Sequence, residues 1–207
     1  MRLYYLLMAV FLAISIEGNA MTRSTPIKNL DPIFLERWSP RAFKKDPIPK
    51  EDLEAIFEAA RWAPSCYNEQ PWLFAYTQTQ EGLKKFQSAL VEFNQTWASN
   101  APVLIIIFSK KTFDRNGKEN QWAPFDTGAA WMSLAMQAHK LGYITHGMGG
   151  FDPKKAFEVA EIDPTKYDVL AVIALGRQGD KNCLPEDMQK GESPSDRKPL
   201  SSIMVEK

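Results

Sequence analysis

The chain has few of the residues that build metal centres or disulfide frameworks. Among its 207 residues are two cysteines, Cys66 and Cys183, and two histidines, His139 and His146. Two cysteines far apart in sequence do not form a disulfide framework, and two histidines do not provide the ligand cluster typical of a zinc site. The composition therefore indicates a reducing compartment and predicts no metal.

An excess of charge of one sign is also absent, because 25 Lys and Arg residues balance 25 Asp and Glu residues. A broad basic surface of the kind that attracts nucleic acid or an anionic membrane is therefore not indicated. Any cationic site must be local. We expect neither nucleic acid nor a membrane as a partner.

Long apolar runs are scarce outside the N-terminus, where Arg2 precedes an apolar stretch from Leu3 to Ile16. This pattern is typical of a secretory signal and is short for a membrane span. Met21 offers another interpretation, in which residues 1–20 are an upstream extension and translation starts at Met21. A start at Met21 implies a cytoplasmic protein and a true signal implies export. In both cases we exclude residues 1–20 and expect one domain over residues 21–207.

A Gly-x-Gly-x-x-Gly motif after a predicted strand is missing too, so a Rossmann dinucleotide site is not supported. Apolar periodicity and β-branched runs instead predict alternating helices and strands. We expect helices near residues 32–37, 50–62, 81–93, 128–141 and 153–162, and strands near 72–77, 103–108, 143–148 and 169–175. The run at 103–108 is apolar throughout and should be the central strand, covered on both faces.

Three further segments differ from this regular pattern. Residues 110–121 are charged, contain Asn116-Gly117 and predict an exposed excursion. The predicted helix at 128–141 is apolar almost all round, so it lies either in a dimer interface or at the centre of a monomer. From Asn182 onward four prolines and glycines prevent regular structure, which predicts an extended tail.

Two polar clusters stand out from the predicted elements. One is the turn from Ala63 to Trp72, which has proline near each end and carries Ser65, Asn68 and Gln70. Their hydroxyl and amide groups both donate and accept hydrogen bonds, as recognition of a planar heterocycle requires. An ordinary capped loop explains the turn equally well. The other cluster lies upstream, where two arginines flank a serine and a proline in Arg37-Trp38-Ser39-Pro40-Arg41-Ala42-Phe43.

Together these clusters resemble the motifs of the nitroreductase family, Arg-x-Ser-x-Arg/Lys-x-Phe and Ala-Pro-Ser-x-x-Asn-x-Gln-Pro-Trp. The resemblance continues through Asp126–Ala130, Gly147–Asp152 and Arg197–Leu200, and covers residues 30 to 203. It implies an α+β fold with a mixed sheet flanked by helices. It also implies an obligate homodimer with two FMN sites at the interface. The extended C-terminal tail of such proteins often adds a strand to the other subunit's sheet.

The resemblance assigns the first cluster to one end of FMN. Arg37 and Arg197 would bind the phosphate, and Ser39 would add a hydroxyl, because a guanidinium makes two charge-assisted bonds to a phosphate. Arg41 would lie beside the flavin N1 and C2 carbonyl, where a cation stabilises the reduced ring. Trp38 belongs to the same set of cofactor-binding residues.

The second cluster would meet the flavin ring of the other subunit. Pro64, Ser65 and Cys66 would lie over the ring and its edge, and Asn68 would bond a ring amide. Many relatives carry serine where this chain has Cys66, whose role is more simply that of a small buried residue. Gly149 and Gly150 match the segment that passes near flavin N5. Several relatives have glutamate at the first of these two positions, so Gly149 leaves the substrate open.

The substrate face has less support from the residues. Trp122 and Phe125 are candidates for lining it, although an aromatic in a helix is usually core. No side chain is predicted to be catalytic, because FMN itself would carry the electrons. His139 and His146 could act as acids, but without a partner motif a structural role is simpler, and protons would come from water.

The resemblance implies two-electron transfer from NAD(P)H through FMN to small electrophilic acceptors such as nitroaromatics or quinones, by a ping-pong mechanism. Two alternatives remain open. The same fold could use FMN for azoline dehydrogenation, dehalogenation or flavin breakdown. The chain could also be a non-catalytic FMN-binding protein for storage or sensing.

Overall fold

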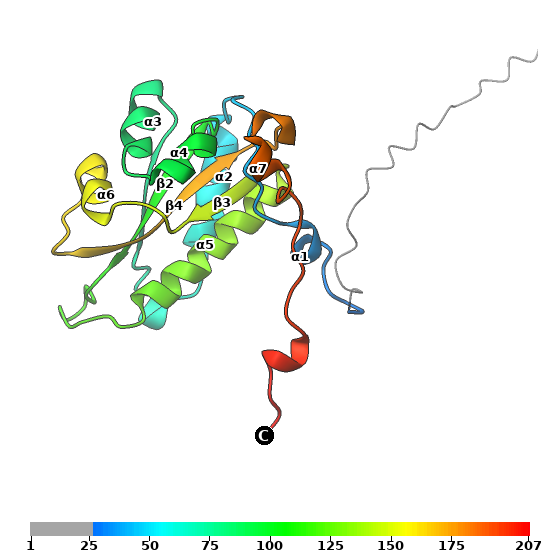
Figure 1. The fold of residues 1–207 in the computed structure, drawn as a ribbon. Helices are drawn as coiled ribbons and strands as arrows, with labels where there is room; N and C mark the ends of the chain where they lie inside the picture. The colour runs from blue at the N-terminus through cyan, green and yellow to red at the C-terminus, as the bar shows by residue number, and fades with distance from the viewer. Residues whose placement is uncertain (1–26) are drawn as a thin grey trace, which may run out of the picture.

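The structure, a computed structural model, describes residues 27–207 (Figure 1). The predictions for residues 1–20 lie outside this range. Among the described residues no helix combines the length and the apolar character needed to cross a bilayer. The predicted α+β class is confirmed by one sheet with helices packed on it.

The sheet has the strand order β1-β2-β4-β3. Its strands are β1 Trp72–Thr77, β2 Val103–Lys110, β3 Ile144–Met148 and β4 Tyr167–Gly176, and each neighbouring pair is antiparallel. The apolar run at 103–108 forms most of β2, which lies between β1 and β4 and is buried on both faces. The predicted central strand is therefore confirmed.

Helices cover both faces of the sheet. They are α1 Ile33–Glu36, α2 Lys50–Arg61, α3 Gln80–Gln87, α4 Glu92–Ala98, α5 Ala123–Lys140, α6 Pro153–Ala160 and α7 Glu186–Gln189. Single 3-10 turns lie at η1 Cys66–Asn68, η2 Lys181–Cys183 and η3 Leu200–Ser202. Arg37 follows α1 directly as its C-cap, as predicted.

The single helix predicted over 81–93 is wrong, because the chain forms two helices there. α3 ends at Gln87, and Leu90 then forms an isolated β-bridge with Phe151. The N–H of Val91 also donates to the carbonyl of Gly150 at 3.1 Å. The carbonyl of Ala89 accepts the N–H of Asp152 at 2.8 Å. Ala89 and Val91 therefore bond the segment after β3, and the helical hydrogen bonds stop and start again in α4.

Alternate side chains of β2 enter two separate cores. Ile105 packs with α2 and α5, for example against Ile56 and Leu134. Ile106, one residue further along β2, packs on the opposite face with Trp97 of α4. This alternation follows from the two-residue period of a strand. The helices α3, α4 and α6 share that opposite face.

The long helix α5 has one buried and one exposed face. Ala130, Leu134 and Ala138 are buried against the sheet. On the other face Phe125 is 77% exposed and Met132 is 38% exposed. Large apolar side chains on an unpartnered face are typical of an interaction surface. The sequence showed apolar residues almost all round this helix. In the structure some of them lie in the core and the others on the surface.

The C-terminal segment leaves the body of the protein after α7 (Figure 1). Leu184 and Met188 anchor the region of α7 in the core. Beyond it, Ile203 and Val205 are exposed. Within residues 182–207 the structure contains no strand, as predicted for an irregular tail, but the short helix α7 and the turn η3 were not predicted.

Candidate functional site

A cavity of about 270 Å³ joins the first sequence cluster to the C-terminal segment. Its walls come from the chain after α1, from β3 and from the segment after α7. The lining residues are Trp38, Ser39, Arg41, His146, Gly191, Ser193, Ser195 and Arg197. Four of the predicted cofactor residues thus lie around one hollow, which we call the arginine cavity. Trp38, Ser39 and Arg41 come from one segment, and Arg197 lies more than 150 positions further along the sequence.

A carboxylate holds the two walls of the arginine cavity together. Oε1 of Glu192 accepts hydrogen bonds from the backbone N–H groups of Arg41, at 2.6 Å, and Ala42, at 2.9 Å. Hydrogen bonds to a charged group are stronger than those between neutral groups. Sequence reasoning missed Glu192, because it lies in an irregular segment where no periodicity or motif distinguishes it from a surface carboxylate.

The donors of the arginine cavity suit a multiply charged anion. Nε of Arg41 is buried and makes no hydrogen bond within the protein. Nη1 of Arg197 donates to the backbone and hydroxyl oxygens of Ser195, which keeps the guanidinium beside this serine of the wall. A phosphate would satisfy this set of donors. Arg37 is half-buried and does not line the cavity, although it directly precedes Trp38.

His146 completes the wall of the arginine cavity from β3. The carbonyl of Pro40 accepts a hydrogen bond from its Nδ1 at 3.0 Å, and its ring lies 4.6 Å from that of Trp97. Burial lowers the pKa of His146, and the nearby Arg41 lowers it further. The imidazole is therefore neutral at pH 7, with its proton on Nδ1. A purely structural histidine was the simpler expectation, but this one also borders the cavity.

A second cavity, of about 300 Å³, collects the other cluster. It lies where the turn after α2 meets the start of α5. The lining residues are Pro64, Ser65, Cys66, Trp122, Phe125, Asp126 and Ala129. The structure thus places the predicted ring-contacting residues beside the predicted substrate-face aromatics. We call this hollow the aromatic cavity.

Asp126 fixes the floor of the aromatic cavity. Its side chain is 4% exposed, and its Oδ2 accepts the backbone N–H of Cys66 at 2.9 Å. The carboxylate sits in the first turn of α5, where the helix dipole favours a negative charge. In the sequence, Asp126 stood out only as part of a segment that resembles a family motif. Its partner could not be predicted, because the hydrogen bond joins residues 60 positions apart.

Asn68, Gly149 and Gly150 line neither cavity. Gly150 is held against α4, where its carbonyl accepts Nδ2 of the buried Asn94 at 2.9 Å. A Cβ at position 150 would lie 2.8 Å from that nitrogen, so the close approach requires glycine. A Cβ at position 149 would meet nothing within 4 Å, which leaves this position open on one side.

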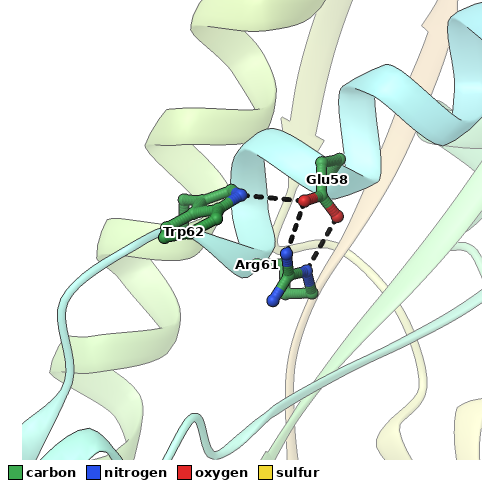
Figure 2. Close-up of polar contacts among 3 residues, drawn as sticks. All are labelled: Glu58, Arg61 and Trp62. Carbon is green, nitrogen blue, oxygen red and sulfur yellow. Dashed lines mark hydrogen bonds and ion pairs between the residues drawn. The ribbon is translucent and has the colours of Figure 1, made fainter.

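Another exposed aromatic, Trp62, immediately precedes the turn and was not among the predicted site residues. It is 75% exposed, yet its indole Nε1 donates to Oε1 of Glu58 at 2.8 Å (Figure 2). Arg61 bonds both oxygens of Glu58, and its guanidinium lies 5.0 Å from the indole ring. The hydrogen bonds from Arg61 and Trp62 lower the pKa of Glu58 to about 2. The carboxylate is therefore charged across the physiological pH range and can accept the indole N–H throughout it.

A larger cavity, of about 570 Å³, lies between α1 and α5 and contains none of the predicted site residues. Glu36 and His139 meet on its wall, with Oε2 and Nε2 separated by 3.9 Å. We assign the candidate site to the two smaller cavities, because they gather the polar motifs and the unsatisfied donor.

The fold and the two cavities define an α+β protein with one cavity lined by two arginines and a second, aromatic cavity beside a polar turn. The model of the nitroreductase family matches residues 35–97 and 85–177, so the chain belongs to the nitroreductase family. The resemblance seen in the sequence is confirmed.

Three relatives illustrate the match. A crystal structure described as that of an oxidoreductase containing FMN superposes with a TM-score of 0.84 at 44% identity, covering 91% of this chain and 96% of that chain. An NADH dehydrogenase of Thermus thermophilus is 24% identical over 89% of this chain and 99% of its own length. An enone reductase of conjugated linoleic acid biosynthesis from Lactiplantibacillus plantarum is 24% identical over 72% of this chain and 85% of its own length.

Proposed function

We propose that the chain is an FMN-dependent oxidoreductase that takes two electrons from NAD(P)H and passes them to small electrophilic acceptors such as quinones and nitroaromatics. The observation that carries the proposal is the arginine cavity, where Arg41, Arg197 and Ser39 converge with a buried guanidinium N–H left unsatisfied. The 44% identity to a structure of an oxidoreductase containing FMN adds support.

The residues present fit FMN at both of its ends. Arg197 and Ser39 would hold the phosphate, with Arg37 from the end of α1 adding charge beside Trp38. Arg41 would stabilise negative charge on the pyrimidine edge of the reduced ring. Bound FMN supplies the two-electron carrier, which no side chain of this chain can provide. Gly149 and Gly150 would leave room at the reacting face.

The site is complete only in a homodimer. The arginine cavity and the aromatic cavity of one chain share no lining residue, and the flavin held by the arginine cavity of one copy would meet the aromatic cavity of the other. A second copy would bring its Pro64, Ser65 and Cys66 over the ring and its Asn68 to a ring amide. The exposed apolar face of α5, with Phe125 and Met132, would be covered in that assembly.

Trp122 and Phe125 would stack on flat acceptors in the aromatic cavity. A pocket with stacking surface and few directional bonds discriminates weakly among such molecules. NAD(P)H and acceptor would occupy the same space in turn, which is a ping-pong mechanism. The similarity to an enone reductase favours activated carbon–carbon double bonds as a second class of acceptor.

The domain would span residues 21–207 of a cytoplasmic enzyme, with residues 1–20 outside the fold. Intact mass spectrometry of protein from its native host tests this part. A mature form that begins at Met1 and is tethered to a membrane would contradict it.

The absorption spectrum of the purified protein tests the cofactor. We expect a flavin spectrum that bleaches when NAD(P)H is added without oxygen and returns when a quinone follows. Double-reciprocal plots with varied NAD(P)H and quinone should be parallel. Bound FMN without NAD(P)H consumption across nitroaromatics, quinones and enones would instead indicate storage or sensing. Intersecting lines would show a ternary complex and overturn the ping-pong mechanism.

A further inference from the structure

The turn that carries Ser65 and Cys66 has an unusual backbone. Tyr67, Asn68 and Gln70 have φ values of +55°, +58° and +51°, which lie in the left-handed region. Side chains other than glycine are rarely found there, and a bulky residue such as tyrosine is an outlier. Such a turn persists only when its surroundings determine it. The contacts that hold this turn must therefore come from its own hydrogen bonds and from the neighbouring elements.

Hydrogen bonds within the turn supply part of the answer. The N–H of Asn68 donates to the carbonyl of Ser65 at 3.0 Å, and the N–H of Gln70 donates to Oγ of Ser65 at 2.9 Å. The bond to Oγ is exposed, so water competes for its donor and acceptor. These bonds tie Ser65 to the shape of the turn, and any movement of the turn moves this residue of the aromatic cavity.

The segment at 113–115 provides the outer support. The guanidinium carbon of Arg115 lies 3.6 Å from the centre of the Tyr67 ring, and Phe113 meets the same ring edge-on at 6.1 Å. Two residues further along the turn, Oε1 of Glu69 accepts the N–H of Asp114 at 2.5 Å. Three consecutive residues, 113–115, thus contact the turn at Tyr67, which is left-handed, and at Glu69, which is not. Tyr67 is held although it is 71% exposed.

This supporting segment is itself anchored. Phe113 is buried, and its N–H donates to the carbonyl of Lys118 at 2.8 Å. Thr112 forms a β-bridge with Glu119, which closes the excursion into a hairpin-like loop. The side chains of Lys110 and Asp114 are also paired. The charged excursion predicted from sequence is therefore an ordered brace.

We propose that Arg115 is a positioning residue of the cofactor site. Its guanidinium clamps Tyr67 in the left-handed turn, and the turn holds Ser65 and Cys66 on the wall of the aromatic cavity. Asp126 fixes the same wall from below through Cys66. This role rests on the proposed function for its effect on FMN, but the clamp itself does not depend on it.

Hydrogen exchange and FMN titration of the full-length protein test the proposal. In Arg115→Ala the amides of Asn68 and Gln70 should exchange about 2- to 5-fold faster, as loss of an exposed cation–π contact implies, and the Kd for FMN should rise by about the same factor. Tyr67→Leu should behave like Arg115→Ala, and Tyr67→Phe, which keeps the ring face, like wild type. Arg115→Lys should restore part of the effect.

Lys118→Ala is the matched control, because it removes the same charge from the same loop and its backbone bonds remain. It should change neither measurement. Unchanged exchange of both amides in Arg115→Ala overturns the proposal, and so does faster exchange with an unchanged Kd for FMN. A wild-type protein that binds no FMN contradicts the proposed function instead, and the exchange comparison still decides whether Arg115 holds the turn.

Discussion

The backbone N–H of Cys66 donates a hydrogen bond to Oδ2 of Asp126, and the two atoms are 2.9 Å apart. The bond fastens the polar turn to the buried Asp126 in the first turn of α5. Replacing the carboxylate by Ala would leave a desolvated N–H without an acceptor. We expect Asp126→Ala to lower the free energy of unfolding by about 1.5–3 kcal/mol, measured by urea denaturation.

Asp126→Asn should cost less, because its amide oxygen can still accept the bond. Asp180→Ala is a matched control, since Asp180 also accepts a backbone N–H, that of Asn182 at 2.9 Å, but on the exposed surface. Equal losses for the buried and the exposed aspartate would show that the bond to Cys66 carries no special weight.

Arg197→Ala should weaken FMN binding through the phosphate alone. Loss of charge-assisted bonds to a phosphate is worth roughly 1.5–3 kcal/mol, and riboflavin, which lacks the phosphate, should bind nearly as well as before. Fluorescence titration with both ligands measures the difference. Arg37→Ala should give the same pattern.

Lys198→Ala controls for charge, because it removes a cation from the neighbouring position. It should leave both affinities close to wild type. If Arg197→Ala weakened FMN and riboflavin equally, the arginine would support the fold of the segment rather than the phosphate.

His146 should make the protein less stable as the pH falls. Burial lowers its pKa in the folded protein below the ordinary value of 6.5, so the unfolded chain binds the proton more readily. At a pH above this ordinary value His146 is neutral in both the folded and the unfolded protein, so it makes no difference to the free energy of unfolding. As the pH falls below that value, the unfolded state gains the proton and stability is lost until the folded pKa is reached.

The groups that face His146 set this behaviour. Arg41 lowers its pKa further, while Glu192 and the carbonyl of Pro40 oppose that trend. Urea denaturation should be carried out between about pH 8 and about pH 5, the range in which histidine titrates. The free energy of unfolding should decline less steeply with falling pH for His146→Gln than for the wild type. His139→Gln, on the surface of α5, should keep the wild-type decline. Identical profiles for all three proteins would contradict the effect.

Met132→Lys should separate the two copies of the proposed homodimer. A lysine on the exposed apolar face of α5 would bury an unpaired charge in the interface, which should raise the dimer dissociation constant at least about tenfold. Sedimentation velocity measures the dimer, and flavin absorbance of the purified protein measures the cofactor. Both should fall together.

Lys154→Glu in α6 changes charge on the other side of the sheet and serves as the control. It should leave sedimentation and flavin content unchanged. A monomeric Met132→Lys protein that keeps FMN at full affinity would mean that one chain builds the whole site.

Periodicity predicted the central elements well, because the spacing of apolar residues along a short segment is enough to indicate a strand or a helix. The run at 103–108 has no polar residue, and its short length and β-branched residues favour a covered strand, while α2 repeats its apolar residues at helical spacing. The break between α3 and α4 could not be predicted in this way. It depends on the pairing of Leu90 and Val91 with a segment about 60 positions away.

The candidate site divides along the same line. Motif spacing pointed to Ser39, Arg41 and Ser65, and the structure places them on cavity walls. It could not point to Glu192 or to the cavity-facing position of His146. Their roles come from contacts across 106 to 151 positions, which leave no local pattern in the chain.

The contact between Glu192 and the backbone of Arg41 also bears on the order in which the parts of the protein can fold. All four strands precede Glu192 in chain order, and the last of them ends at Gly176. During synthesis the sheet can therefore fold while one wall of the arginine cavity has not yet left the ribosome. The wall that contains Glu192 would therefore be the last part of the arginine cavity to form, after the strands of the sheet are paired.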